Sequence, residues 1–284
     1  MFQRRKTGSV ICPSCGKLVG VRDSACWNCG RRNPGMWGFA PVLQRLGNDF
    51  GFVPLVIAGC SVLYAATLLA DPRGVRAGGA LTFMAPSLRS LLHFGASGAL
   101  PVFGLGRWWT VLSAGWLHGG ILHLMFNMLW VRQLAPATAE LYGGARMIII
   151  YTISSVCGFL LSSTAYLLFG RLPLPMLRGA GFTVGASAAI FGLLGALVYY
   201  GRRTGSSRIG GQAKTYAVIL FVFGFVMPGV DNYAHAGGFL GGYAAASLLD
   251  PLRPERIDHV AAALACLGLT AASVAASLLQ DVRL

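Results

Sequence analysis

Seven apolar runs divide most of this chain, and they restrict its fold more than any other feature. The runs cover residues 52–70, 117–134, 146–169, 183–200, 213–227, 231–249 and 259–280. A helix needs roughly 20 residues to span a bilayer, with a range of about 17–25. Only 11% of the residues are charged, against about 25% in a soluble domain. The sequence therefore predicts an all-α, polytopic membrane helix bundle of about seven transmembrane helices, in which the run at 213–227 is short.

The positive charges of the chain predict how this bundle is oriented. The net charge is +14, and most of the 23 Lys and Arg fall in the N-terminal segment and in the loops that share its side of the membrane. Such residues accumulate on the cytoplasmic side, so we expect a cytoplasmic N-terminus. This distribution argues for membrane topology rather than for nucleic acid as a partner. A secondary interpretation places Arg4, Arg5 and Lys6 on anionic lipid headgroups of the bilayer.

Two Cys-x-x-Cys pairs, each followed by glycine, contain four of the seven cysteines: Cys12, Cys15, Cys26 and Cys29. Four thiolates at this spacing suit one tetrahedral Zn²⁺. Two disulfides or a redox pair are the alternative, which a reducing cytoplasm disfavours. Because so short a segment has almost no core, we expect it to fold only with its metal. Residues 1–32 are therefore predicted to form a cytoplasmic zinc ribbon with structural Zn²⁺.

The role of this ribbon is less well defined by its sequence. Arg22, Arg31 and Arg32 flank the cysteine pairs and leave nucleic acid as one interpretation, but docking of a cytoplasmic protein is the more usual role of such a module. Residues 33–51 are predicted to be a linker with an interfacial segment, because their aromatic side chains suit the headgroup region. The glycines and proline of this linker predict weak mechanical coupling between the ribbon and the membrane domain at 52–284.

Three polar side chains share one depth in the predicted membrane. With the N-terminus inside, the runs that contain His123, Ser187 and His235 all begin at the outer face. At a rise of 1.5 Å per residue, the three side chains lie roughly 6–9 Å below that face. Ionisable groups inside membrane segments are rare, and each is a functional candidate by default. The shared depth therefore predicts a polar cavity that opens to the outer face.

The types of these residues indicate nucleophilic catalysis. A histidine within hydrogen-bond reach turns a weak serine hydroxyl into a nucleophile, so Ser187 and His235 are candidates for such a pair. Gly238 and Gly242 form a Gly-x-x-x-Gly pattern, which lets a neighbouring helix approach closely. Asp231 precedes His235 by one helical turn, but we expect it to cap the helix rather than to complete a triad. The chemistry is therefore predicted to use a Ser-His dyad and no catalytic cofactor.

Taken together, these motifs resemble the rhomboid family of intramembrane serine proteases. The resemblance is carried by residues 106–110, 118, 123–127, 140–143, 185–187, 190–195, 228–235, 238 and 242. It implies that Ser187 is the nucleophile and that His235 is the general base and then the general acid. It further implies that His123, Asn127 and the backbone amide of Ser187 form the oxyanion hole.

The resemblance also implies an architecture and a substrate class. The fold would be a six-helix rhomboid core plus one helix, in a bacterial inner (plasma) membrane. The protein would be an intramembrane serine endopeptidase that cleaves single-pass transmembrane proteins, with its dyad open to the outer face. Two positions depart from the family pattern. Ala188 replaces a frequent glycine beside the serine, and Thr110 replaces the arginine of a Trp-Arg pair that supports the first loop.

Two alternatives stay open at this point. A catalytically inactive rhomboid-like protein that binds membrane clients would share the fold, but such a protein would be expected to lack Ser187 or His235, and both are present. A transporter or channel would use the histidines, among them His118 and His123, as a proton path. The sequence offers such a path no buried carboxylate and no inverted repeat, so we favour the protease.

Overall fold

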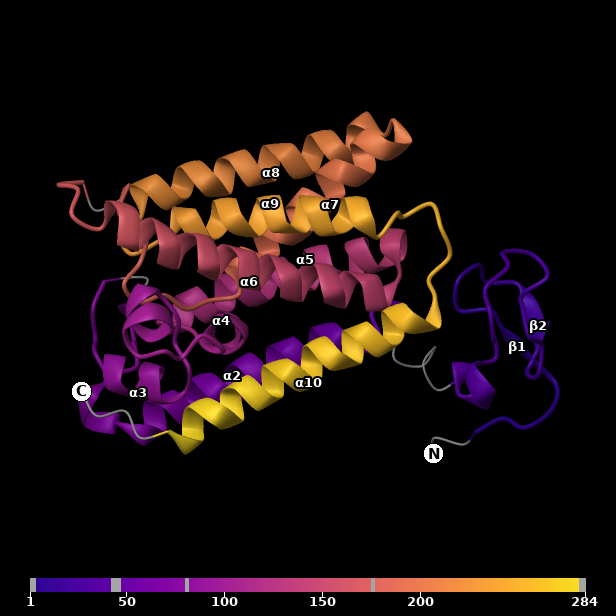
Figure 1. Cartoon of the computed structure of the whole chain (residues 1–284), viewed down its shortest axis with the longest axis horizontal. Coiled ribbons are helices and arrows are strands. Elements are labelled where there is room, and N and C mark those ends of the chain that lie inside the picture. Colours follow the sequence, from indigo (N-terminus) through magenta and orange to yellow (C-terminus); the bar gives the residue numbers. More distant parts are fainter. Residues whose placement is uncertain (1–3, 42–46, 80–81, 175–176, 281–284) are drawn as a thin grey trace.

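The computed structural model describes residues 4–41, 47–79, 82–174 and 177–280. Seven long helices form a bundle in these ranges (Figure 1), which confirms the predicted all-α fold. They are α2 (Phe52–Ala70), α5 (Ile121–Tyr142), α6 (Gly144–Phe169), α7 (Ser187–Thr204), α8 (Ser207–Val226), α9 (Asn232–Leu248) and α10 (Ile257–Leu279). Each predicted apolar run therefore corresponds to one long helix.

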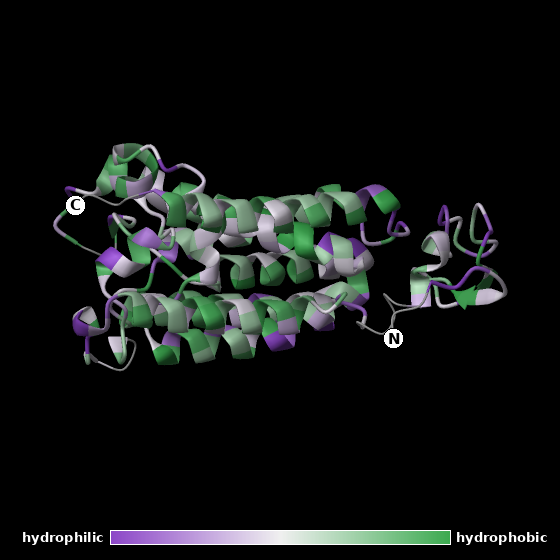
Figure 2. Cartoon of the chain, turned by 90° about the horizontal axis from the view of Figure 1, so that it is seen from below, coloured by the Kyte–Doolittle hydropathy of each residue, from purple (hydrophilic) through white to green (hydrophobic). Residues whose placement is uncertain are grey.

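The helices differ in how apolar they are. Four of them, α2, α6, α8 and α10, are long and apolar enough to cross a membrane. Figure 2 shows hydrophobic residues along the length of the helices of the bundle. By contrast, α7 and α9 are only 18 and 17 residues long, and they pack against each other and against α6. The helix predicted to be short, α8, reaches 20 residues because it begins at Ser207, after a cap in which the Ser206 hydroxyl accepts from the Ile209 amide.

A small ribbon lies beyond one end of this bundle. It contains the antiparallel strands β1 (Ser9–Ile11) and β2 (Leu18–Gly20), followed by the short helix η1 (Met36–Gly38). The ribbon lies next to the connection between α9 and α10, whereas α9 begins at the opposite end of the bundle (Figure 1). We call these two ends of the bundle the ribbon end and the site end.

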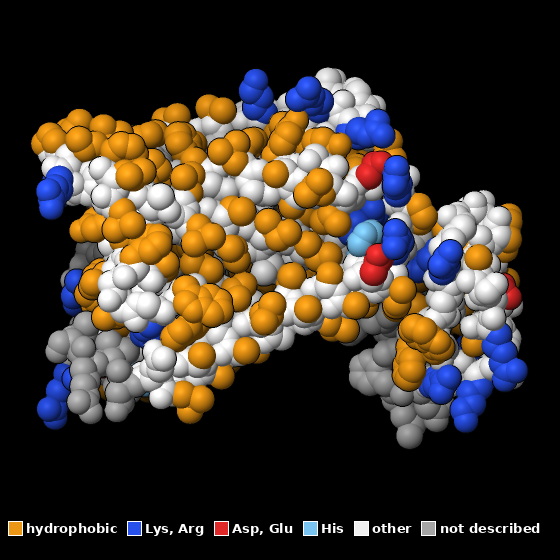
Figure 3. Space-filling view, viewed as in Figure 1, with side chains coloured by type: hydrophobic (Ala, Val, Ile, Leu, Met, Phe, Trp, Pro, Cys, Tyr) orange, Lys and Arg blue, Asp and Glu red, His pale blue; other side chains and the backbone are white. Residues whose placement is uncertain are grey.

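The ribbon is docked on the bundle. The Arg31 guanidinium lies 3.9 Å from the Glu255 carboxylate, and both side chains are buried. Val260 of α10 packs against the hydrophobic core of the ribbon. The acidic side chains visible in Figure 3 lie at this end of the bundle and on the ribbon. These contacts join residues far apart in sequence, which the composition of the linker does not indicate.

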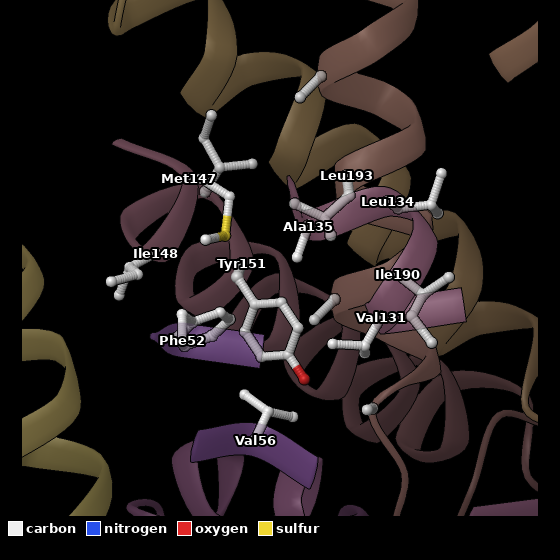
Figure 4. Packing of buried hydrophobic residues seen from close by; sticks show 14 of the residues in the cluster. Phe52, Val56, Val131, Leu134, Ala135, Met147, Ile148, Tyr151, Ile190 and Leu193 are labelled. Carbon is white, nitrogen blue, oxygen red and sulfur yellow. The ribbon is translucent and has the colours of Figure 1, made fainter. Parts of the chain in front are cut away.

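The largest core cluster fixes α7 among its neighbours (Figure 4). The rings of Phe52 and Tyr151 pack edge to face with their centroids 5.0 Å apart and join α2 to α6. The Tyr142 hydroxyl donates to the Ala196 carbonyl at 2.9 Å and joins α5 to α7. Because lipid tails are as apolar as these side chains, close packing and such hydrogen bonds hold helices together in a membrane. Ser187, the first residue of α7, thereby has a fixed position.

A long connection between α2 and α5 supports the site end. Its elements are η2 (Pro72–Gly74), α3 (Leu88–His93), η4 (Leu100–Gly104), α4 (Thr110–Ser113) and η5 (Ala114–Trp116). Ser97 pairs with Thr183 in an isolated bridge, so the connection lies beside the segment that leads into α7. Arg107 donates to the carbonyls of Leu92 and Ser277 at 2.8 and 3.1 Å. These bonds tie the loop to α10 although Thr110 replaces the arginine expected from the family pattern.

Candidate active site and metal centre

Ser187 and His235 meet at the site end of the bundle. The Nε2 atom of His235 lies 3.0 Å from the Oγ atom of Ser187, which is a normal hydrogen-bond distance. Ser187 begins α7 and is half-buried, whereas His235 lies in the first turn of α9 and is 6% exposed. The two predicted residues are therefore brought together by two helices that are distant in sequence.

Glycines allow this close approach. A Cβ atom on Gly238 would collide with the carbonyl oxygen of Ala188, and one on Gly242 would collide with the backbone of Gly192. The predicted Gly-x-x-x-Gly face therefore lies directly on α7, backbone against backbone. Ala188, the other departure from the family pattern, belongs to this contact and is 1% exposed. Its methyl group lies at the helix interface.

Phe191 holds the imidazole of His235, a role that no sequence motif predicted. The two rings are stacked, with centroids 4.2 Å apart and planes inclined by 15°. Phe191 lies one helical turn after Ser187 on α7, so both side chains occupy the same face of that helix. The signal in the sequence was an aromatic residue four positions after the serine, but its partner on α9 is known only from the fold.

His123 and Asn127 lie on α5 beside the same turn. The Gly119 amide donates to Nδ1 of His123 at 3.3 Å, so the other ring nitrogen, Nε2, carries the proton of a neutral imidazole. A Cβ atom on Gly185 would lie 2.7 Å from that Nε2 atom. Gly185 also has a φ of +130°, which favours glycine. The His123 N–H is thereby directed at the turn that leads into Ser187.

Asn127 supports the same helix face. Its Nδ2 atom donates to the His123 carbonyl at 2.8 Å, and the residue is 5% exposed. An amide nitrogen has two hydrogens, so the second remains available for another acceptor. The structure therefore brings the four predicted residues of the site to one end of three helices.

The Asp231 carboxylate does not bond the His235 ring, although the His235 amide donates to the Asp231 carbonyl at 3.1 Å. The carboxylate accepts from the Ala234 amide at 3.0 Å and from the Ser162 hydroxyl at 2.6 Å, so it caps α9 as expected. The Nδ1 atom of His235 is buried and has no hydrogen-bond partner among the described residues. His118 packs edge to face on His123 with ring centroids 5.2 Å apart. Among the described residues, no carboxylate completes a triad.

Four cysteines meet in the ribbon: Cys12, Cys15, Cys26 and Cys29, whose sulfur atoms all lie within 4.8 Å of one another. The sulfurs of Cys12 and Cys29 are 3.7 Å apart, and those of Cys15 and Cys26 are 3.6 Å apart. Four sulfurs at ~2.3 Å from a tetrahedral Zn²⁺ would be separated by ~3.8 Å. The cluster therefore fits a metal ion of this size and geometry, and none of its cysteines forms a disulfide.

The turns of the ribbon are built for this cluster. Gly16 and Gly30 follow the two pairs with φ values of +72° and +71°, in the left-handed region that favours glycine. Their amides donate to the carbonyls of Cys12 and Cys26, each at 2.9 Å. The backbone amides of Ser14, Lys17 and Arg31 also donate to the sulfurs of Cys12, Cys15 and Cys29, respectively. These bonds orient the four sulfurs toward one another.

Comparisons with known proteins agree with this architecture. The model of the Rhomboid domain family matches residues 105–251, which is about half of the chain. The chain is 35% identical over 163 residues to rhomboid protease GluP of Bacillus subtilis, covering 56% of this chain and 29% of GluP. It is 31% identical over 228 residues to RHOMBOID-like protein 5 of Arabidopsis thaliana, covering 72% of this chain and 68% of that protein.

A third relative is Rhomboid-like protease 3 of Toxoplasma gondii, which is 29% identical over 165 residues, covering 56% of this chain and 58% of the relative. This chain thus spans from 29% to 68% of the length of these relatives. The family match lies on the segment that contains Ser187 and His235 and excludes the ribbon. The chain is an integral membrane protein that belongs to the rhomboid family, which includes proteins named as proteases.

Proposed function

We propose that this protein is an intramembrane serine endopeptidase that uses Ser187 as its nucleophile and His235 as its base. The observation that carries the proposal is the 3.0 Å approach of the Ser187 Oγ atom to the His235 Nε2 atom at one end of a membrane bundle. A weak hydroxyl becomes a nucleophile when a base lies within this reach. Membership of a family that includes named proteases supports the same chemistry.

The geometry supports a conventional acyl-transfer sequence. The Oγ atom of Ser187 attacks the carbonyl carbon of the substrate, and its proton passes to Nε2 of His235. His235 then gives this proton to the amine that leaves. Water hydrolyses the acyl-enzyme by the same steps in reverse order. Among the described residues, no carboxylate orients the Nδ1 atom of His235. The stacked ring of Phe191 takes over this task and keeps the imidazole in position.

Three donors are proposed to stabilise the oxyanion of the tetrahedral intermediate. The Nε2–H group of His123 is directed at the turn before Ser187, and the second amide hydrogen of Asn127 lies on the same helix face. The backbone amide of Ser187 is the third donor. Each such donor typically contributes about 10²–10³ to the rate.

The proposed substrates are single-pass transmembrane proteins. A helical peptide protects its carbonyls in its own hydrogen bonds, so the substrate has to be extended at the cut, and Gly or Pro near it would help. Entry between α5 and α8 suits such a substrate. The helix α8 packs mainly on α7, and Trp130 and Tyr216 provide a ring contact between α5 and α8. The dyad is proposed to open to the outer face, with Ser187 half-buried.

A fluorophosphonate probe tests the proposal directly. We expect covalent labelling of the solubilised protein at Ser187, and loss of labelling in Ser187→Ala. Ser163→Ala is a matched control, because Ser163 is a buried membrane serine whose hydroxyl bonds the Phe159 carbonyl. A folded protein that is never labelled, and that cleaves none of a panel of co-expressed single-pass proteins, would instead be an inactive client-binding member of the family.

We also propose that the four ribbon cysteines bind one structural Zn²⁺, that the N-terminus is cytoplasmic in a bacterial inner membrane, and that a cytoplasmic protein docks on the ribbon. The proposed domains are the ribbon at 1–32, a linker at 33–51 and the membrane protease domain at 52–284. Purified protein should contain about one equivalent of zinc. The double substitution Cys12→Ser and Cys15→Ser should remove it, whereas Cys266→Ser in α10 should not.

A further inference from the structure

A basic cleft on the ribbon has no role in the proposed chemistry. It has a volume of about 500 Å³ and is lined by Arg4, Arg5, Lys6, Val21, Arg22, Asp23, Ser24, Asn33 and Trp37. The lining therefore contains four cationic side chains and one carboxylate. That carboxylate, of Asp23, already accepts from the Gly20 amide at 2.7 Å. The cleft is thus a concentrated positive site that suits an anionic group.

The backbone around the cleft is held in an unusual conformation. Arg5 donates its amide to the Gly38 carbonyl at 2.9 Å, and the Nε atom of Arg4 donates to the Trp37 carbonyl at 2.6 Å. Gly38 has a φ of +92°, and a Cβ atom there would collide with the Arg5 carbonyl oxygen. Trp37 has a φ of 52°, in the left-handed region that non-glycine residues rarely adopt. The N-terminal segment is thereby fixed along the edge of the cleft.

Two exposed aromatic side chains adjoin these cations. Trp37 is 60% exposed and Phe39 is 46% exposed, and the Arg4 guanidinium lies 5.7 Å from the centre of the Phe39 ring. Figure 3 shows a hydrophobic patch on the ribbon beside the bundle, with Lys and Arg side chains next to it. Exposed tryptophan beside clustered cations is typical of the membrane–water interface.

The position of the ribbon favours lipid over a soluble partner. Glu255 and Val260 hold the ribbon against the end of the bundle, next to the point at which the membrane helices end. The chain also enters α2 at Phe52 shortly after the aromatic pair. The cleft is therefore held near the bilayer surface, where phospholipid headgroups are concentrated. Sites for single-stranded nucleic acid also combine cations with aromatic rings. Nucleic acid is not concentrated at the bilayer surface, however, whereas lipid headgroups are.

We propose that this cleft binds the phosphate headgroup of an anionic phospholipid, with Trp37 and Phe39 in the interfacial layer. The cations of Arg4, Arg5, Lys6 and Arg22 supply the charge, and the aromatic pair supplies contact with the lipid. The ribbon then has two attachments, one to the bundle through Glu255 and one to the bilayer. This binding site goes beyond the proposed proteolysis and does not depend on it.

The test uses the full-length zinc-loaded protein in a neutral detergent. Phosphatidylglycerol is added in one titration and phosphatidylcholine in a second, and the two titrations are compared. The readout is the emission of Trp37, obtained as the difference between the full chain and Trp37→Phe. We expect phosphatidylglycerol to shift this emission to the blue and phosphatidylcholine to leave it unchanged. Lys6→Gln combined with Arg22→Gln should raise the half-saturating concentration roughly tenfold or more, given the usual contribution of each cation near anionic lipid.

A matched variant keeps this test specific. Lys17→Gln combined with Arg32→Gln removes the same charge from exposed ribbon residues outside the cleft, and it should leave the titration unchanged. Equal zinc content in all variants establishes that each ribbon is folded. Equal titrations for the two double variants, or an equal shift with phosphatidylcholine, would overturn the proposal. So would displacement of the lipid by equimolar inorganic phosphate, which indicates a soluble anion site, or by single-stranded RNA, which indicates nucleic acid.

Discussion

At the site end of the bundle, Ser187 and His235 meet through backbone contacts and a stacked ring, whereas at the ribbon end Arg31, Glu255 and Arg146 form a buried charged cluster. All four ion pairs between described residues lie at the ribbon end. The contact between Ser187 and His235 at the site end is built from glycine, serine, histidine and phenylalanine. Polar groups in this apolar protein are thus fixed in two ways, by close backbone packing at the site end and by buried charges at the ribbon end.

Each way suits what the end has to do. Close backbone packing leaves the side chains of the site free of strong partners, so they can exchange a proton with a substrate. At the ribbon end, Glu255 accepts from the amides of Ala145 and Arg146 at 2.8 and 3.1 Å and caps α6. Burial raises the pKa of the Glu255 carboxyl, while the Arg146 amide and the Arg31 guanidinium lower it. These contacts connect α6 to the ribbon.

The largest expected effect comes from disturbing the backbone contact at the site end. Gly238→Val places a side chain against Ala188 and separates α9 from α7. Because a misplacement of about 1 Å can cost about 10²-fold in rate, we expect cleavage of a transmembrane substrate to fall at least that far. Gly268→Val on α10 is the control, since a Cβ atom there meets nothing within 4 Å. Similar activities for the two variants would show that close packing does not position the dyad.

The next largest effect tests whether His123 and Asn127 on α5 act as donors to the oxyanion. Asn127→Ala should lower turnover by roughly 10- to 1,000-fold without unfolding the protein, because it removes a donor to the oxyanion. Thr138→Ala is matched to it, since Thr138 lies on the same helix and also donates to a carbonyl one turn earlier, at 2.8 Å. Full turnover in both Asn127→Ala and His123→Ala would make that pair structural only.

Most of the site end was predictable because its signals are local in sequence. The Gly-x-x-x-Gly pattern predicted a close approach of α9 to another helix. The spacing of four between His123 and Asn127 places both on one face of α5. Apolar runs located every long helix, but they missed the polar first turns of α8 and the end of α5, which extends beyond residue 134 to Tyr142. The stacking of Phe191 on His235 could not be predicted, because the sequence of neither helix determines how the two helices are rotated relative to each other.

The ribbon end was less predictable for a different reason. The linker composition suggested independence, but Arg31 and Glu255 pair across most of the chain. No periodicity or spacing indicates such a pair, and each residue alone is typical of a solvent-exposed position. Likewise, the cysteine spacing predicted the cluster, whereas the cleft beside it depends on the left-handed turn at Trp37 and Gly38. Contacts between distant segments require the fold.

A smaller effect separates stability from activity at the ribbon end. Glu255→Gln leaves the Arg31 charge buried without its partner, and breaking such a pair costs about 3–5 kcal/mol. We therefore expect a lower thermal unfolding midpoint with cleavage retained within a few-fold. Asp258→Asn is the control, because the Arg256–Asp258 pair is exposed and such pairs contribute about 0–1 kcal/mol. Equal midpoints for both variants would show that the Arg31–Glu255 pair does not anchor the ribbon.

The smallest expected effect on activity comes from deleting residues 1–35. About 30 Å of bilayer separates the ribbon end from the site end, so the ribbon supplies no catalytic group. We expect cleavage of a generic transmembrane substrate in detergent to stay within a few-fold of the full chain. Stability should fall, because Glu255 loses Arg31 and keeps only the amides that cap α6.

A double-mutant cycle completes this test. Glu255→Gln should lower the unfolding midpoint of the truncated chain far less than that of the full chain, because Arg31 is no longer present to be left unpaired. Additive effects would mean that Glu255 acts only as a cap of α6 and that the ribbon is held by other contacts, such as Val260. A folded truncated protein with no cleavage activity would remove the distinction between the two ends, since the ribbon would then act on Ser187 and His235 through the bundle.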